Sequence, residues 1–346
     1  MTKHGPLTIL IGSPLEPDQV ERIAAVDSGR VEVLYEPDLL PVPRYEGDHH
    51  GVPRELDETQ LGYWNSLVAR SEVMFDFDWI GPATLPTRAP RLRWLQATSA
   101  GIGELLERSG LTGSGIRFTT AAGVHAAALS EFVLLALLYW TKDVPFLQRR
   151  QAEERWERYT ARALTGQRIL VVGLGQVGRR IAEACSALGV DVWGVRRRSD
   201  APPPSFVSRL VPREDLQEAL TAVDALVLAC PLTRETHHLI GRTELEALPA
   251  RAIVVNVGRG AVIDEPELVR VLEEGRIRGA VLDAFEHEPL PLESPLWRLP
   301  NVLVSPHSAS TVGGENARIV DIFVDNLERY LDSRPLQNEF EPERGY

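Results

Sequence analysis

The amino-acid sequence predicts an α/β protein with two Rossmann-like domains, each built on a doubly wound parallel sheet. Three observations lead to this prediction. The chain has 346 residues, which is too long for one typical compact domain. Short apolar strand patterns alternate with helical patterns in two separate stretches. In the second stretch the strands are apolar throughout, as expected of a parallel sheet that is covered on both faces.

The first stretch of alternation runs from the N-terminus to about residue 125. Strands are expected at "LTILIG", "VEVLYE" and "EVMFDFDW", with a helical pattern after each of the first two. The segment 36–58 is rich in Pro, charge and His, and is expected to be an exposed connection. Its adjacent His49 and His50 have no Cys or acidic partner at ligand spacing, so we interpret them as part of a solvated loop and predict no metal site.

A strongly helical segment, "HAAALSEFVLLALLYWTKDVPFLQRRQAEERWERY", follows at residues 125–159. Its first half is apolar all round and is expected to be buried, whereas its charged second half is expected on a surface or an interface. Six further strands are expected at "RILVVGLG", "VDVWGVR", "ALVLACP", "AIVVNVG", "GAVLDAF" and "NVLVSPH", and a last helix at "ENARIVDIFVDNLERYLDS". We therefore expect a dinucleotide-binding domain at 126–307, inserted into a substrate-binding domain made of 1–125 and 308–346.

Composition and charge argue against several kinds of partner. The net charge of −12 disfavours nonspecific binding to nucleic acid or to an anionic membrane. The most apolar segment, "FVLLALLYW", is too short to span a bilayer, and the first residues lack a signal-peptide pattern, so we expect a cytoplasmic protein. Cys185 and Cys230 lie in apolar contexts and are expected to be buried and reduced.

Gly173, Gly175 and Gly178 form a G-x-G-x-x-G motif between an expected strand and an expected helix. In such a motif the first glycine permits a tight turn, the second lets the backbone approach a pyrophosphate, and the third lets the helix pack closely on the strand. The helix N-terminus offers N–H groups and a partial positive charge to the phosphates. This loop, which includes Gln176 and Val177, is therefore predicted to bind a dinucleotide.

The next strand ends at "GVRRRS", and this ending bears on which dinucleotide is bound. The position that usually holds an acid for the ribose 2′-hydroxyl of NAD is Arg196. Arg197 and Arg198 add planar donors suited to a 2′-phosphate, and Ser199 adds a hydroxyl. We therefore predict NADP(H) as the preferred cofactor, with NAD(H) possible. The alternative is a solvated loop in a protein whose basic residues are nearly all Arg.

Polar residues follow three of the later strands: Arg259, Glu288 and His307. Ligands of open parallel sheets bind outside the carboxyl ends of the strands, so these residues are expected to face the same crevice as the glycine loop. A surface salt bridge, a solvated acid and a capping histidine are the structural alternatives. The presence of all three residues at one sheet edge favours a functional site.

On these residues, the sequence resembles the D-2-hydroxyacid dehydrogenases, the D-isomer-specific NAD(P)-dependent family. The matching elements are "GLGQVG", "CPLTRETHHLIG", "NVGRGAVIDEPELVRVLEEGRIRGAVLDAFEHEPL" and "SPHSAS". The stretch "GVHAAALSEFVLLALL" and the Arg run are most similar to the glyoxylate/hydroxypyruvate reductase branch. His125 stands where many members have Asn, and Ser130 where Ala is common.

The resemblance implies that Arg259, Glu288 and His307 are the catalytic residues. Arg259 would bind and polarise a 2-keto acid, His307 would donate a proton to the developing alkoxide, and Glu288 would orient the imidazole and favour its charged form. His287 is the rival acid. The resemblance also implies further cofactor contacts from Cys230, Pro231, Thr236, Val257 and Asp283, and substrate binding by Ser99, Ala100 and Gly101 together with Arg259 and His307.

The implied function is hydride transfer between NADPH and a small 2-keto acid, giving a D-2-hydroxy acid, with the active site in the cleft between the domains. Phe75, Phe77 and Trp79 are expected either to shape that pocket or to pack in the core. The segment 149–159 resembles the family's dimer arm, so a homodimer is expected. Two alternatives remain: a dinucleotide-sensing interaction protein of the same fold, and a family dehydrogenase that acts on a non-keto substrate such as formate.

Overall fold

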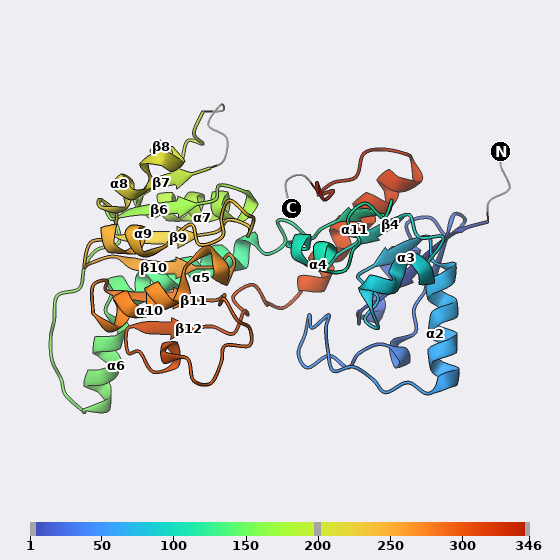
Figure 1. Cartoon of the computed structure of the whole chain (residues 1–346), viewed down its shortest axis with the longest axis horizontal. Helices are drawn as coiled ribbons and strands as arrows, with labels where there is room; N and C mark the ends of the chain where they lie inside the picture. Colours follow the sequence, from blue (N-terminus) through green and yellow to red (C-terminus); the bar gives the residue numbers. More distant parts are fainter. Residues whose placement is uncertain (1–4, 197–201, 343–346) are drawn as a thin grey trace. The chain divides into compact units, whose positions relative to one another are not determined.

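The computed structural model describes residues 5–196 and 202–342 (Figure 1). The chain divides into two compact units: one is His125–Ser310, and the other combines the chain up to Val124 with the chain from Thr311 onward. Arg197, Arg198 and Ser199, which were expected to bind a 2′-phosphate, lie outside the described residues.

The unit His125–Ser310 is built on a seven-stranded sheet in the order β12-β11-β10-β9-β6-β7-β8, in which every neighbouring pair is parallel. Six of its strands coincide with the expected ones. The edge strand β8 was not expected, because it is only three residues long and its first residue is exposed. The strands are β6 (Arg168–Val172), β7 (Asp191–Val195), β8 (Arg209–Val211), β9 (Ala225–Leu228), β10 (Ile253–Asn256), β11 (Gly279–Leu282) and β12 (Val302–Val304).

Helices cover both faces of this sheet (Figure 1). In β6, Ile169 and Val171 face the core formed with one set of helices, whereas Leu170 and Val172 face the core formed with the other set. A strand that is buried on both faces requires apolar side chains at every position, which explains the unbroken apolar pattern. The first set is α5 (Ala126–Thr141) and α7 (Gln176–Ala187); the second is α8 (Leu216–Leu220), α9 (Arg242–Ala247) and α10 (Glu265–Glu273).

The helical segment that was expected through Tyr159 is interrupted and shorter, so that prediction is wrong in its second half. After α5, Asp143 adopts a left-handed conformation with φ 52°, and Pro145 lies in the first turn of α6 (Val144–Ala152). Proline is tolerated there because its missing N–H would have no partner in a first turn. No residue of α6 is buried, and the charged residues after Ala152 have no core to pack against, so the helix ends.

The second unit has a five-stranded parallel sheet in the order β2-β1-β3-β4-β5. Its strands are β1 (Leu7–Ile11), β2 (Val31–Leu34), β3 (Val73–Phe75), β4 (Trp94–Gln96) and β5 (Arg117–Thr119), of which β4 and β5 were not expected as strands. One face is covered by α1 (Pro17–Ala24) and α11 (Glu315–Leu331), the other by α2 (Glu58–Arg70), α3 (Leu85–Arg88) and α4 (Gly103–Arg108).

The remaining regular elements are short 3₁₀ helices at Pro37–Leu39, Pro82–Thr84, Arg213–Asp215, Gly260–Val262 and Pro295–Trp297. Phe75 packs edge-to-face on Phe323 in the core, with ring centroids 5.2 Å apart, and Phe77 stacks on Phe118. Cys185 and Cys230 are both buried and free, as expected. Within the described ranges, no helix combines the length and the apolar character that a membrane crossing requires.

Candidate active site

The glycine loop joins β6 to α7, and its three glycines meet different surroundings. A Cβ atom at Gly173, where φ is +95°, would lie 2.7 Å from Cα of Cys230, and one at Gly178 would lie 1.7 Å from the Gly173 carbonyl oxygen. A Cβ at Gly175 would meet nothing within 4 Å. Gly173 and Gly178 are therefore required by the packing itself. Gly175 leaves open space at the exposed N-terminus of a 12-residue helix, which fits the approach of a pyrophosphate.

The other predicted cofactor residues within the described ranges lie at the same sheet edge. Arg196 follows β7 directly and is half-buried, while Cys230 follows β9 and packs against the glycine loop. The hydroxyl of Thr236 donates to the carbonyl oxygen of Pro231 at 2.7 Å and accepts from the Thr233 N–H at 2.8 Å, which closes the loop after β9. Val257, directly after β10, is buried. Four neighbouring strands thus contribute to one edge.

His307 and Glu288 form a hydrogen-bonded pair at the carboxyl ends of β12 and β11. The His307 Nδ1 lies 2.7 Å from the Glu288 Oε2, and the other carboxylate oxygen accepts from the Phe285 N–H at 2.9 Å. An ionised carboxylate only accepts hydrogen bonds, so the imidazole carries a proton on Nδ1. The His307 side chain is 43% exposed, which leaves Nε2 available to a ligand.

The electrostatics of this pair favour its charged form. The hydrogen bond that His307 donates to Glu288 raises the pKa of His307, against an opposing effect of burial and of the Arg259 charge. Burial alone would raise the pKa of Glu288, but the hydrogen bonds from His307 and the Phe285 N–H outweigh it and lower that pKa. A raised pKa favours the protonated imidazole, which is the form that can act as a general acid.

Arg259 follows β10 on a backbone that is fixed on both sides. Its carbonyl oxygen accepts from the Asn256 Nδ2 at 3.1 Å, and the Asn256 Oδ1 accepts from the Gly258 N–H at 3.0 Å. A Cβ at Gly260 would lie 1.8 Å from the Phe285 carbonyl carbon, so the Arg259 loop is pressed against the loop that leads to Glu288. The Arg259 charge acts on both members of the His307–Glu288 pair, which joins the three residues in one electrostatic site.

Asp283 organises the loop that carries His307. Its Oδ1 accepts from the Ser305 hydroxyl at 2.6 Å, from the Ser308 N–H at 2.9 Å and from the Ala309 N–H at 3.0 Å. Asp283 itself is only 3% exposed. The resemblance assigned this residue to the cofactor, and that role stays a prediction. The contacts in the structure show that Asp283 positions the neighbours of His307.

Two further sets of predicted residues are His287 and the loop 99–101. His287 is exposed, and no hydrogen bond joins it to another side chain among the described residues. Ser99, Ala100 and Gly101 belong to the other unit, in the loop between β4 and α4, where Ser99 and Gly101 are exposed. Their role in binding a substrate carboxylate stays a prediction.

Sequence reasoning missed a half-buried polar group at the carboxyl edge of the five-stranded sheet. His49 is not part of a solvated loop: its Nδ1 lies 3.2 Å from the Ser13 hydroxyl, and its Nε2 is buried without a partner among the described residues. Burial lowers the pKa of His49, although the Asp76 charge acts in the opposite direction. Asp76, at φ 68°, accepts from the Thr98 hydroxyl at 3.0 Å. The strand ending "IGSP" was the one local signal for this group.

The fold and the side chains at the seven-stranded sheet define a class of protein, the dinucleotide-dependent oxidoreductases with parallel α/β domains. Residues 134–309 match the family model of the D-isomer specific 2-hydroxyacid dehydrogenase, NAD binding domain. The chain belongs to that family and is an enzyme, a 2-hydroxyacid dehydrogenase that uses a nicotinamide cofactor.

Similar proteins agree with this assignment. The chain is 32% identical over 258 residues to Glyoxylate/hydroxypyruvate reductase HPR3 of Arabidopsis thaliana, covering 73% of this chain and 77% of the relative. It is 33% identical over 250 residues to a glyoxylate reductase of Thermofilum pendens, covering 69% and 72%. A D-isomer specific 2-hydroxyacid dehydrogenase of Xanthobacter autotrophicus Py2, solved in complex with NADPH and MES, superposes with a TM-score of 0.79 at 29% identity, over 99% of this chain and 100% of that one.

Proposed function

We propose that the protein reduces small 2-keto acids of the glyoxylate and hydroxypyruvate type with NADPH, and that it yields the D-isomer where the product is chiral. The observation that carries this proposal is the Glu288–His307 hydrogen bond of 2.7 Å, which lies at the sheet edge that bears the glycine loop. The positive charge of Arg259 acts on this pair. The similarity to reductases of glyoxylate and hydroxypyruvate supports the choice of substrate.

The reduction adds a hydride to the carbonyl carbon and a proton to the carbonyl oxygen. The nicotinamide cofactor supplies the hydride. The proton comes from Nε2 of His307, because Nδ1 is committed to Glu288. The guanidinium of Arg259 binds the substrate carboxylate and polarises its carbonyl group, since its planar fork matches a carboxylate. Glu288 holds the imidazole in one orientation and stabilises its protonated form before transfer.

The test is purified protein with NADPH or NADH against a panel of 2-keto acids, with the configuration of each chiral product determined by chiral chromatography. We expect cofactor oxidation with glyoxylate and hydroxypyruvate, and D-glycerate from hydroxypyruvate. Cofactor binding without turnover of any 2-keto acid would favour the dinucleotide-sensing alternative. Oxidation of formate with no reduction of keto acids would favour the non-keto alternative.

We further propose a preference for NADPH, based on Arg196 at the end of β7 and on the two arginines that follow it in the sequence. An exposed charged hydrogen bond contributes about 1–2 kcal/mol, so two of them to a 2′-phosphate give about 30- to 900-fold discrimination. Arg196→Asp should reverse the preference, because the acid repels the phosphate and accepts from ribose hydroxyls. The measurement is kcat/KM for both cofactors. Equal values, or a preference for NADH, in the wild type would contradict this proposal.

We also propose that the protein is a cytoplasmic homodimer that associates through α6 and the segment after it. Large apolar side chains are exposed there: Leu147 is 43% exposed and Trp156 is 96% exposed. Exposed large apolar side chains in one segment favour a protein–protein contact there. The double variant Leu147→Glu/Trp156→Glu should be monomeric in light scattering after size-exclusion chromatography. Trp297→Glu, a charge at another partly exposed Trp of the same unit, is the control and should stay dimeric. A monomeric wild type would refute the homodimer.

A further inference from the structure

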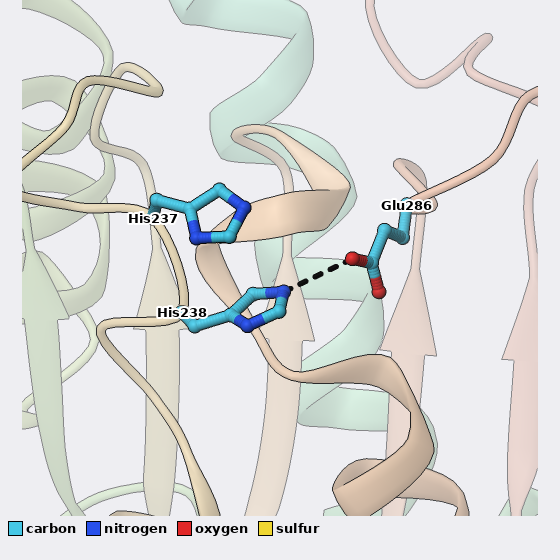
Figure 2. A group of neighbouring side chains, drawn as sticks. All are labelled: His237, His238 and Glu286. Carbon is cyan, nitrogen blue, oxygen red and sulfur yellow. Dashed lines mark hydrogen bonds and ion pairs between the residues drawn. The ribbon is translucent and has the colours of Figure 1, made fainter.

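Three side chains outside the His307–Glu288 pair lie close together: His237, His238 and Glu286 (Figure 2). The ligating atoms of these residues all lie within 4.8 Å of one another. The Nε2 of His238 lies 3.0 Å from the Oε1 of Glu286, and the two imidazole rings lie 4.0 Å apart between centroids. The histidines come from the loop after β9 and the carboxylate from the loop after β11.

The backbones that carry these side chains are held in place independently of the cluster. The His237 N–H donates to the Thr233 carbonyl at 2.9 Å, and the His238 N–H to the Ala261 carbonyl at 2.8 Å. The Glu286 N–H donates to the Glu265 carboxylate at 3.0 Å. His238 also has a left-handed φ of 47°, which is uncommon for a residue other than glycine. The cluster is therefore presented by two loops whose main chains are already fixed.

We propose that His237, His238 and Glu286 bind one divalent transition-metal ion of the Zn²⁺ type. Two imidazoles and a carboxylate are the ligands that such ions take, whereas Mg²⁺ and Ca²⁺ prefer oxygen ligands alone. Ligands of one tetrahedral Zn²⁺ ion lie roughly 3.3 Å apart, given bonds of about 2.0–2.1 Å. The His238–Glu286 pair is already near this spacing at 3.0 Å, and the ligating atoms of all three residues lie within 4.8 Å of one another.

The surroundings of the cluster allow an ion to enter and to complete its coordination with water. The His238 and Glu286 side chains are 34% and 23% exposed, and His237 is exposed. The carboxylate balances part of the charge of the ion. At Nε2 of His238, the ion takes the place of the proton that is now donated to Glu286.

A bound ion would connect the loop after β9 with the loop after β11, which reaches Glu288 two residues later. The first of these loops also contains Thr236, one of the predicted cofactor residues. An ion that binds the folded state alone raises the free energy of unfolding. Occupancy of the cluster should therefore raise the midpoint of thermal unfolding.

The test is calorimetric titration of ZnCl₂ into full-length, metal-stripped protein without a histidine tag. We expect one equivalent to bind and a higher unfolding midpoint in its presence. His237→Ala and Glu286→Gln should each weaken binding by more than about tenfold, because even outer-shell changes cost that much. His50→Ala, at an exposed histidine of the other unit, is the control and should bind like wild type. Circular dichroism confirms that each variant is folded.

Several results would overturn the proposal. These are a wild type that binds no Zn²⁺, unchanged affinity in both cluster variants, and equal binding of MgCl₂. A crystal soaked in ZnCl₂ should show an anomalous difference peak at the cluster. A peak at Glu288 and His307 instead would assign the ion to the catalytic pair. None of these measurements depends on turnover, so they stand apart from the test of the proposed function.

Discussion

His307 and His49 lie beside the carboxyl ends of two different parallel sheets, and their pKa values are shifted in opposite directions. A hydrogen bond to the Glu288 carboxylate raises the pKa of His307. Burial lowers the pKa of His49, whose hydrogen-bonding partner is the neutral hydroxyl of Ser13. A place at the edge of a parallel sheet therefore does not set the proton affinity of a histidine. The nearest partner and the access of water set it.

The same contrast separates the chemistry of the two edges. The edge of the seven-stranded sheet holds a charged trio, Arg259, Glu288 and His307, in which the histidine remains open to a ligand. The edge of the five-stranded sheet holds Ser13 and His49 in hydrogen-bond contact, with a half-buried imidazole whose lowered pKa disfavours the cation. One edge is suited to move a proton, and the other to hold a neutral hydrogen-bonded arrangement.

The largest effect on activity is expected at His307. His307→Ala removes the proton donor, so kcat should fall by about 10²–10⁴-fold, the usual scale for general acid–base catalysis. The dissociation constant for NADPH, measured by fluorescence titration, should hardly change, because the glycine loop is untouched. His287→Ala is the matched control and should keep most of its activity. If His307→Ala stayed active while His287→Ala were inactive, the proton donor would be His287 and not His307.

Glu288→Gln gives His307 a neutral partner, like the partner of His49, in place of a charged one. Without the carboxylate the pKa of His307 should fall, and kcat should drop by about 10²-fold, the lower end of the same range. Reduction needs the protonated imidazole, so activity is lost as the pH rises through that pKa. The alkaline limb of the profile of kcat/KM against pH should therefore move to lower pH in Glu288→Gln. An unmoved limb would mean that another group controls it.

The smallest expected effect concerns stability and His49. The folded state disfavours protonation of His49, so unfolding takes up a proton when the pH falls below about 6.5, the ordinary pKa of histidine. The resulting stability is present above that pH and is lost on acidification. Thermal unfolding midpoints between about pH 7 and pH 5.5 should therefore fall less in His49→Gln than in wild type.

His50→Gln serves as the control for this measurement, since His50 is exposed and adjacent. It should show the pH dependence of the wild type. His307 acts with the opposite sign, because its raised pKa gives stability below about pH 6.5 that is lost as the pH rises through the folded value. Identical slopes for His49→Gln and wild type would show that the His49 imidazole does not titrate in this range.

The features that could be predicted from the sequence are those that depend on local pattern, namely the central strands and the glycine turn. The apolar runs identified the central strands of the seven-stranded sheet, because a strand covered on both faces needs apolar side chains at successive positions. The spacing of Gly173, Gly175 and Gly178 identified the turn from β6 to α7, because backbone conformation and close packing there exclude a Cβ at two of the three positions. The strands β4, β5 and β8 were missed, because three residues are too few to show a period unless they lie in a longer apolar run, as β3 does in "EVMFDFDW".

The contacts between polar side chains that are distant in the sequence depend on the tertiary structure. His49 and Ser13 are 36 residues apart in the chain, and His238 and Glu286 are 48 apart. A local sequence pattern cannot reveal contacts between residues this far apart in the chain. Parallel topology brings successive strand ends to one edge only after the intervening helices have packed. The contact of Gly260 with Phe285 fixes the loop of Arg259 against that of Glu288 in the same way. Residue types were readable from the chain, but their partners, burial and proton affinities follow from the long-range packing of the folded units.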